Sequence, residues 1–308
     1  ERGIGDEAPL HIMQLRERRA FGPFEIEMVT LTHSIPEPNG LAIRTPLGLI
    51  LHTGDWKIDP DPIIGEDFDQ AKIEELGREG ILAMVCDSTN VFEEGEAGSE
   101  GMAREALRRA VAEQTGRVAI TSFASNVARV QSACEAARAN DRSVCLVGRS
   151  MLRIVGAAQS VGLLKGFDFI DPEDAADLPH QHVLYLCTGS QGEPNAALAR
   201  IARGDHPFVK LGEDDTVIFS SRVIPGNERA ISEIQNTLAE RNIKLVTARQ
   251  FDIHVSGHPC RDELRRMYMW AKPQIAVPVH GERRHIMEHA RFAKSLQIPY
   301  AITPDNGH

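Results

Sequence analysis

Three short segments of the sequence place a histidine or an aspartate directly after an apolar, strand-like run: His33, Asp55 and His280. A side chain in such a position can turn away from the core toward a cleft. Imidazole and carboxylate groups are common zinc ligands, and one carboxylate can bridge two ions about 3.5–4 Å apart. Taken singly, each residue is more typical of a hydrogen-bonded or solvated side chain. Taken together, the three indicate dispersed ligands of a metal centre, in which Asp55 suits the bridge.

A second pair of residues, Asp87 and His258, suits acid–base chemistry. Asp87 ends an apolar run, and His258 follows Ser256-Gly257. A carboxylate that accepts a hydrogen bond from one ring nitrogen fixes the tautomer and raises the basicity of the imidazole. Such a histidine could protonate a leaving alkoxide. The alternative is that Asp87 caps the stretch after a buried strand and that His258 belongs to an ordinary turn before Pro259.

Small polar residues near that pair could bind a phosphate group. His254 and Ser256 offer side-chain donors, and Gly257 lets the main chain approach an anion. Other polar residues follow a strand-like run farther upstream, where the carboxyl ends of parallel strands face a ligand crevice. These upstream residues could equally cap the next helix. The hypothesis of a phosphate site includes His254, Ser256, Gly257, His258, Ser122, Ser125 and Asn126.

The elements that must position these residues change in character along the chain. Residues 24–56 favour antiparallel strands, at 24–31, 41–44 and 49–53. From residue 81 onward, apolar strands alternate with helices, which predicts a parallel sheet flanked by helices. Those strands are expected at 81–86, 118–121, 144–147, 184–187, 217–219, 245–247, 274–279 and 300–303, and helices at 104–113, 126–137, 262–271 and 282–296. We interpret Arg283, Arg284, His285 and His289, which lie at helical spacing, as a solvated helix face.

Composition disfavours several classes of protein. No apolar run of the 308 residues approaches the roughly 20 residues of a membrane span, so we expect no membrane association. The five cysteines are odd in number and scattered, which favours reduced thiols in a cytoplasm. The formal net charge of −10 weighs against a general RNA-coating protein, because affinity for the phosphate backbone rests on Lys and Arg.

The order His, Asp, His resembles the later ligand motifs of the metallo-β-lactamase fold. Ser256-Gly257-His258, followed by Val279-His280-Gly281-Glu282, resembles the β-CASP branch of that fold, which cuts nucleic acids. Residues 32–36, 86–90, 188–194 and 254–258 are similar to motifs of the ribonuclease J family, and the similarity covers nearly the whole chain. The His-x-His-x-Asp-His loop of the fold is not found in the sequence, which begins at Glu1 without Met. We therefore expect an interior piece of a longer enzyme, without that loop and without the family's C-terminal domain.

The resemblance implies an α/β fold, namely a partial metallo-β-lactamase αββα sandwich with an inserted Rossmann-like β-CASP domain. The first part of the lactamase domain would comprise residues 1–98, the β-CASP domain 99–259, and the second part of the lactamase domain 260–308. The acidic, glycine-rich segment 93–99 is the expected linker. The candidate residues are then expected to converge in one cleft at the domain junction: His33, Asp55, Asp87, His258 and His280.

For function, the resemblance implies a metal-dependent ribonuclease that hydrolyses RNA phosphodiester bonds by a two-metal hydroxide mechanism. Exonuclease activity in the 5′-to-3′ direction and endonuclease activity are implied too, as is a homo-oligomer of the full-length protein. His33 would complete the shell of one ion and His280 that of the other, with Asp55, Asp87 and His258 as catalytic residues. Two divalent ions are expected, zinc first, with manganese or magnesium as alternatives. Because this chain offers each ion few ligands, it should by itself bind metal weakly and be inactive.

Two other functions stay open at this point. A catalytically inactive RNA-binding or scaffolding β-CASP protein is consistent with the missing loop. A small-molecule hydrolase of the metallo-β-lactamase fold is disfavoured by the long stretch between Asp87 and His258, because such hydrolases lack the inserted domain.

Overall fold

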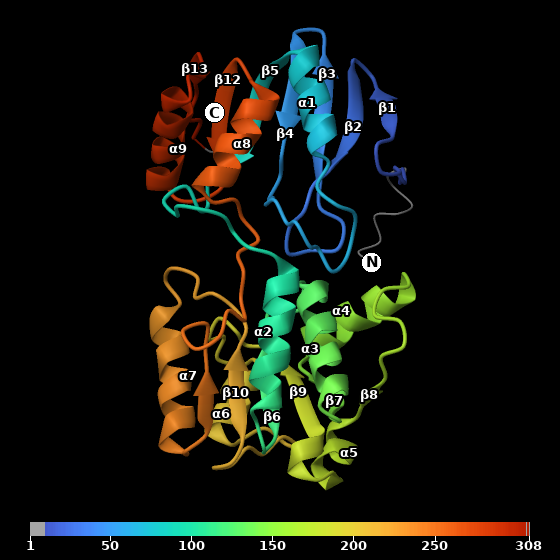
Figure 1. The fold of residues 1–308 in the computed structure, drawn as a ribbon, viewed down its shortest axis with the longest axis vertical. Coiled ribbons are helices and arrows are strands. Elements are labelled where there is room, and N and C mark those ends of the chain that lie inside the picture. Colours follow the sequence, from blue (N-terminus) through green and yellow to red (C-terminus); the bar gives the residue numbers. More distant parts are fainter. Residues whose placement is uncertain (1–9, 306, 308) are drawn as a thin grey trace.

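The computed structural model describes residues 10–305 and residue 307, which fold around two β-sheets (Figure 1). The first sheet has seven strands in the order β1-β2-β3-β4-β5-β12-β13. The second has six strands in the order β11-β10-β6-β9-β7-β8. The strands of the first sheet are β1 (Arg18–Phe21), β2 (Phe24–Thr30), β3 (Asn39–Thr45), β4 (Gly48–His52), β5 (Ile81–Asp87), β12 (Ile275–Val279) and β13 (Tyr300–Ala301). Those of the second are β6 (Val118–Thr121), β7 (Ser143–Val147), β8 (Phe169–Ile170), β9 (Val183–Cys187), β10 (Thr216–Phe219) and β11 (Lys244–Val246).

The direction of the strands in the first sheet sets up one functional edge. Strands β1 to β4 are antiparallel neighbours, whereas β4, β5, β12 and β13 run parallel. Strand β2 therefore points the same way as β4, β5 and β12, and the carboxyl ends of these four strands meet at one edge of the sheet. The register places Val279 of β12 opposite Asp87 of β5, although the two residues are far apart in sequence.

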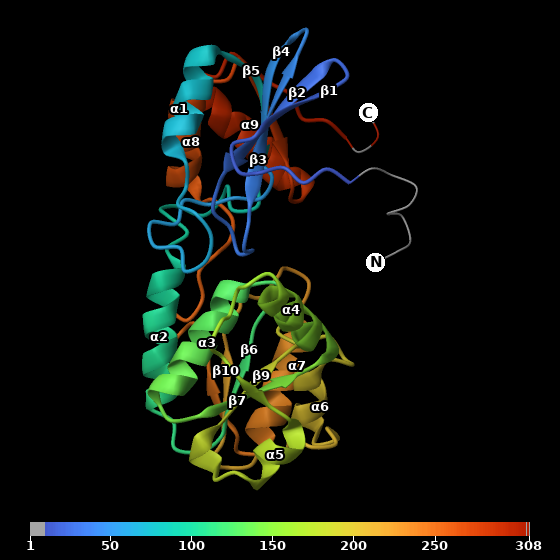
Figure 2. The ribbon, with the colours of Figure 1, turned by 90° about the vertical axis from the view of Figure 1, so that its right-hand side faces the viewer.

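Three helices contribute to the hydrophobic core of the first sheet: α1 (Gln70–Glu79), α8 (Arg261–Ala271) and α9 (Arg283–Ser295). Figure 2 shows α1 and α8 side by side against one face of the sheet. Their apolar residues pack with fully buried strand residues such as Val29, Leu51 and Met84. This packing fixes the strands whose ends carry the candidate residues.

The second sheet is parallel throughout and has helices on both faces. One core contains α2 (Glu100–Ala112), α3 (Val127–Ala139) and α4 (Arg149–Ser160). The other contains α5 (Pro172–Asp177), α6 (Ala197–Arg203) and α7 (Glu228–Glu240), as Figure 2 shows on the opposite side. Strands β6, β9 and β10 are buried along their whole length, which explains their continuous apolar runs. Their carboxyl ends point toward the first sheet (Figure 1).

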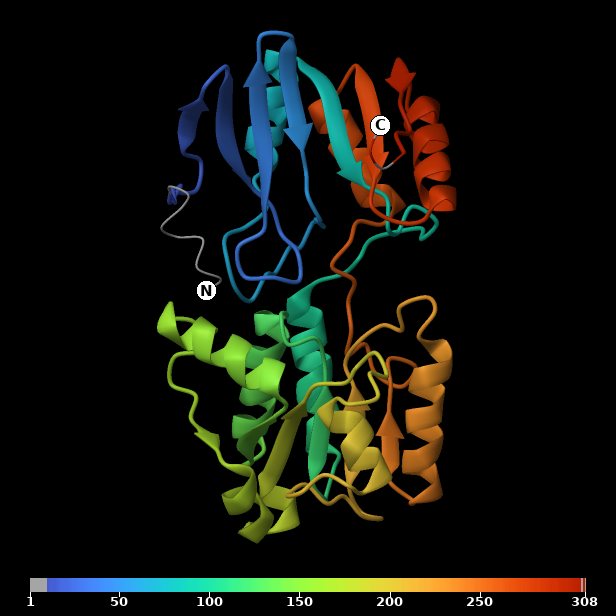
Figure 3. The same cartoon turned by 180° about the vertical axis from the view of Figure 1, so that it is seen from behind.

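Two chain segments connect the sheets, and they lie side by side between them (Figure 3). They are joined by hydrogen bonds from Arg261 N to Glu93 O and from Asp262 N to Gly95 O, 2.9 and 3.2 Å long. The fully buried carboxylate of Glu263 accepts hydrogen bonds from the backbone N–H groups of Ile58, Ala97 and Cys260, each 2.8–2.9 Å long. One side chain thus fastens both connections to the first sheet.

The fold class predicted from the sequence is confirmed, since an antiparallel region precedes a parallel sheet flanked by helices. The predicted strand 118–121 matches β6 residue for residue, but helix α2 begins at Glu100 and not at residue 104. The hydroxyl of Ser99 caps α2 by accepting a hydrogen bond from Met102 N, which adds a turn. Strand β13 ends at Ala301, two residues before the predicted end. No described helix combines the length and apolar character that a membrane crossing requires.

Candidate metal centre

The candidate residues of the first sheet come from the strand ends at its functional edge. His33 follows β2, Asp55 follows β4, Asp87 ends β5 and His280 follows β12. His258 reaches the same place from the second connection, just before α8. His280 has a left-handed backbone with φ 59°, which is uncommon for a residue other than glycine and turns the chain sharply at the strand end. The structure thus brings all five residues to one place.

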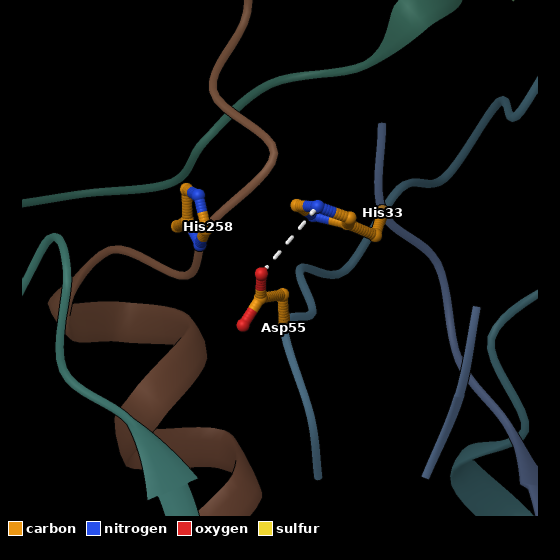
Figure 4. A group of neighbouring side chains, drawn as sticks. All are labelled: His33, Asp55 and His258. Atoms are coloured by element: carbon orange, nitrogen blue, oxygen red, sulfur yellow. Dashed lines mark ion pairs between the residues drawn. The ribbon is translucent and has the colours of Figure 1, made fainter. Parts of the chain in front are cut away.

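The carboxylate of Asp55 lies between two histidines. Its Oδ2 is 4.0 Å from Nε2 of His33, as Figure 4 shows, and its Oδ1 is 3.7 Å from Nε2 of His280. The ring of His258 lies 5.0 Å from that of His33 and 5.3 Å from that of His280, measured between centroids. Each oxygen of Asp55 therefore faces a different imidazole, which is the arrangement that a bridging carboxylate needs.

The orientation of His33 is fixed by Gly257. Nδ1 of His33 donates to the carbonyl oxygen of Gly257 over 2.5 Å, so Nδ1 carries a proton. Burial lowers the pKa of His33, although the Gly257 carbonyl favours the charged form, and the neutral ring keeps a lone pair on Nε2 toward Asp55. A Cβ atom at position 257 would lie 2.4 Å from Ser34 Oγ and 2.7 Å from His33 Cε1. Only glycine leaves room for this contact.

Asp87 and His258 form a close pair. Nδ1 of His258 donates to Oδ2 of Asp87 over 2.6 Å, while Oδ1 of Asp87 accepts from N and Oγ1 of Thr89. Burial opposes both charges, but the hydrogen bond and mutual attraction prevail, so the pKa of Asp87 is lowered and that of His258 is raised. Nε2 of His258 has no hydrogen-bond partner within residues 10–305. It is therefore the atom available for a ligand or for proton transfer.

The ligand atoms at this edge suit divalent metal ions. One group comprises His33, Asp55 and His258, the other Asp87, His258 and His280, and the atoms of each lie within 4.8 Å of one another. Imidazole nitrogens with carboxylate oxygens are the donor set of zinc and of related transition metals. The sequence hypothesis kept His258 outside the metal shells, whereas the geometry allows Nε2 of this residue either to ligate an ion or to donate a proton.

The segment around Ser256 is held by internal hydrogen bonds. Nδ2 of Asn90 donates to Ser256 Oγ over 2.7 Å and to the carbonyl of His258 over 2.9 Å, and His258 N donates to Ser256 Oγ over 3.1 Å. The Ser256 oxygen thus accepts two hydrogen bonds, which leaves its own hydrogen for a phosphate. The carbonyl of Gly257 serves His33, so its expected role as a phosphate contact is limited to its N–H group.

His254 lies on the side of the second sheet. Burial, together with the nearby charges of Arg129, Arg222 and Lys57, lowers its pKa to about 3, so the ring is neutral at physiological pH. Its Nδ1 is buried without a hydrogen-bond partner among the described residues, and so is Oγ of Ser122 at the end of β6. Buried polar atoms are normally paired, so these two are candidates for contact with a ligand.

Asn126 caps helix α3, which is the alternative role that the sequence allowed. Its Oδ1 accepts from Arg129 N at the start of α3, and its Nδ2 donates to Glu100 Oε1. Both polar atoms of the side chain are thus hydrogen-bonded to residues of α2 and α3. The proposed contact of Asn126 with a phosphate is therefore not supported. Ser125, one residue earlier, is exposed.

Comparisons with known proteins indicate the family of the chain. Residues 115–238 match the family model described as ribonuclease J, beta-CASP domain, and residues 226–300 match the Zn-dependent metallo-hydrolase RNA specificity domain. Ribonuclease J of Sinorhizobium meliloti (strain Sm2011 / Rm2011 / 2011) is 48% identical over 98% of this chain and 54% of its own length. Ribonuclease J of Synechocystis sp. is 39% identical over 97% of this chain and 47% of its own. The chain belongs to the ribonuclease J family.

This ribonuclease J family chain spans about half the length of the curated relatives it matches. A solved structure, described as a protein of unknown function from Enterococcus faecalis V583, matches 96% of this chain and 66% of its own with a TM-score of 0.64. At 16% identity it supports the fold alone.

Sequence reasoning missed several residues around the site. Asn90 lies within a segment whose similarity was noted, but its role in holding residues 256–258 was not foreseen. The interpretation of His289 as part of a solvated helix face is wrong, because its side chain is fully buried. A signal was present: His289 lies three and four residues before Phe292 and Ala293, on the buried face of α9.

Proposed function

We propose that the full-length protein is a metal-dependent ribonuclease that hydrolyses RNA phosphodiester bonds at the edge of the first sheet. The observation that carries the proposal is the carboxylate of Asp55, whose two oxygens face His33 and His280 beside the Asp87–His258 pair. The names of the relatives, all ribonuclease J, support RNA as the substrate. We further propose cleavage both from the 5′ end and internally, in RNA processing and decay.

We propose that His33, Asp55 and His280 hold two divalent ions, zinc in the first place, with further ligands from outside the residues described. When bound, such ions supply Lewis-acid chemistry and lower the pKa of a water molecule. The neutral ring of His33 presents Nε2 in the form that binds a metal, because Nδ1 is committed to Gly257. Asp55 contributes one oxygen toward each side.

His258 acts on the proton in this proposal. Asp87 holds Nδ1 and raises the pKa of His258, which favours the charged ring that carries a proton on Nε2. That proton can pass to the leaving 3′ oxygen of the RNA, after which the neutral ring stays hydrogen-bonded to Asp87. Ser122, Ser256 and His254 have hydrogen-bonding capacity left and would contact phosphates of the RNA chain.

The proposal includes the division of the chain into lactamase parts at 1–98 and 260–308 and a β-CASP domain at 99–259. The RNA would then lie between the two sheets. All five cysteines are buried free thiols, which supports a reducing compartment such as the cytoplasm.

The test uses the full-length protein, stripped of metal by a chelator and then reloaded with zinc or manganese. We expect hydrolysis of a 5′-monophosphorylated RNA to disappear on stripping and return on reloading, with no hydrolysis of a chromogenic β-lactam or a thioester. Hydrolysis of the small substrates but not of RNA would favour the small-molecule hydrolase. RNA binding without cleavage in any metal would favour the inactive scaffold.

A further inference from the structure

His289 lies in a closed polar chain behind the site. Its side chain, on α9, is fully buried. Nδ1 is 2.8 Å from Oγ of Ser88, and Nε2 is 2.9 Å from the hydroxyl of Tyr268 on α8. One ring nitrogen donates and the other accepts, so the imidazole links a helix on one side to the end of β5 on the other.

Burial keeps this imidazole neutral. It lowers the pKa of His289 to about 4, and the nearby charge of Asp87 opposes that shift only weakly. A neutral ring with both nitrogens hydrogen-bonded is a stable, directional linker, since breaking either contact would leave a buried polar group unpaired. The three hydrogen-bonded side chains are all shielded from solvent, because Ser88 and Tyr268 are buried like His289.

Ser88, whose hydroxyl contacts His289, lies in a short segment, residues 87–90, that orients His258. On one side of Ser88, Asp87 binds the ring of His258. On the other side, Asn90 holds Ser256 and the backbone of His258. Asp87 and Asn90, which lie before and after Ser88 in the sequence, therefore both orient His258, one through its ring and the other through its main chain, while Ser88 itself turns inward to His289.

We propose that His289 is a positioning residue: by holding the hydroxyl of Ser88, it fixes the backbone of residues 87–90 and so aligns His258 for its work. The inference rests on the proposed function for its kinetic consequence, but its structural consequence can be measured independently. His289 and Ser88 then act as one unit, and Tyr268 steadies the far side of the ring.

The test compares His289→Leu, Ser88→Ala and the double variant in the full-length enzyme loaded with metal. We expect kcat for RNA cleavage to fall about tenfold in each single variant, with KM and metal content within about twofold of wild type. The double variant should be no slower than the slower single variant, because the two residues share one interaction. His289→Gln, whose amide can bond both neighbours, should recover part of kcat, and Tyr268→Phe should lose less than Ser88→Ala.

Phe292→Leu is the matched control, since it loosens the same buried face of α9 without touching Ser88. It should lower Tm and leave kcat unchanged. Equal kcat losses in Phe292→Leu and His289→Leu at equal Tm would overturn the proposal, as would wild-type kcat in Ser88→Ala or additive losses in the double variant. If His289→Leu fails to fold, Ser88→Ala decides alone.

A separate readout keeps the proposal apart from the proposed function. In the wild-type protein, the proton between His258 Nδ1 and Asp87 should give a far-downfield NMR signal, because the two atoms are 2.6 Å apart. Ser88→Ala should shift or broaden that signal whether or not the protein cleaves RNA. An unchanged signal would refute the positioning role, whereas an inactive wild type with a changed signal would refute only the proposed ribonuclease activity.

Discussion

Two clusters of polar residues at the junction, one around Asp55 and one around Arg129, differ in how their polar groups are used. On the side of the first sheet, Asp55 has its oxygens 3.7 and 4.0 Å from ring nitrogens of His280 and His33, beyond hydrogen-bond distance. On the side of the second sheet, Arg129 is bound to Glu100 through two hydrogen bonds of 3.1 and 2.9 Å and to Ser220 Oγ at 2.7 Å. The groups around Asp55 are thus left for a ligand, whereas those around Arg129 are already hydrogen-bonded to one another.

Polar residues at the junction therefore acquire their role from their partners. Arg129 and Glu100 are almost fully buried, and such an ion pair costs desolvation that only good geometry offsets. It therefore fixes how α2 and α3 meet. Asp55 is half exposed and free of strong protein contacts.

Asp55→Ala should show the largest effect on chemistry. Loss of the proposed bridging charge should remove bound metal and lower the rate of RNA cleavage at least about 10³-fold, since metal ions contribute several kcal/mol to such reactions. Mass spectrometry of bound metal and a cleavage assay on the full-length protein would measure both. Its counterpart, Glu100→Gln, should cost several kcal/mol of the free energy of unfolding, near the roughly 3–5 kcal/mol of a broken buried pair, and keep its metal. Metal retained by Asp55→Ala would contradict the contrast.

His258→Ala should lower turnover by about 10²–10⁴-fold, the usual range for one acid–base group, while the metals stay. Asp87→Asn should produce a milder loss of the same kind, because the imidazole remains but its tautomer is no longer fixed. The same two measurements apply. If His258→Ala loses its metal, the residue is a ligand, as its place in both groups of ligand atoms allows.

Gly257→Ala should weaken metal binding by about 10–100-fold, the usual effect of disturbing a group that orients a ligand. The added Cβ would approach His33 Cε1 to 2.7 Å, so the ring must turn away from Asp55. Titration with a metal indicator would measure the affinity. Gly156→Ala is the control, since a Cβ there meets nothing within 4 Å and position 156 lies inside helix α4. Equal metal affinities of Gly257→Ala and Gly156→Ala would show that Gly257 does not orient His33 for metal binding.

The smallest predicted effect is on stability as a function of pH. The pKa of His258 is raised, so its stabilising contribution is present below the ordinary imidazole pKa of 6.5 and is lost as pH rises through the folded-state pKa. The lowered pKa of Asp87 makes its contribution present above 3.8 and lost in stronger acid. Asp87→Asn should thus cost more unfolding free energy near about pH 5 than near about pH 9. Urea unfolding in metal-free buffer would measure it, and an equal cost at both values would show that the pair is not charged.

Much of the fold could be predicted because local patterns are strong here. The apolar run Val118–Thr121 predicts a strand that is buried on both faces, and β6 is that strand. The alternation of strands and helices after residue 81 predicts the parallel sheet, since successive parallel strands need crossover connections. The residues of the candidate site could also be named, because a His or an Asp that ends an apolar run stands out from its surroundings. That they share one edge followed only from the resemblance.

Tertiary structure alone decided the rest, because the partner of a side chain depends on segments distant in sequence. The pairing of β5 with β12 brings Asp87 beside His280, and no local pattern encodes that register. The same packing gives Asn126 its partner Glu100 and leaves Ser122 without one among the described residues. A helical period can mark the buried face of α9. Burial of the His289 imidazole, however, is tolerated only because Ser88 and Tyr268 satisfy the hydrogen-bonding capacity of its two ring nitrogens. Local sequence patterns therefore specify which elements and which chemical groups are present, and long-range packing specifies which groups are paired and which are left for a ligand.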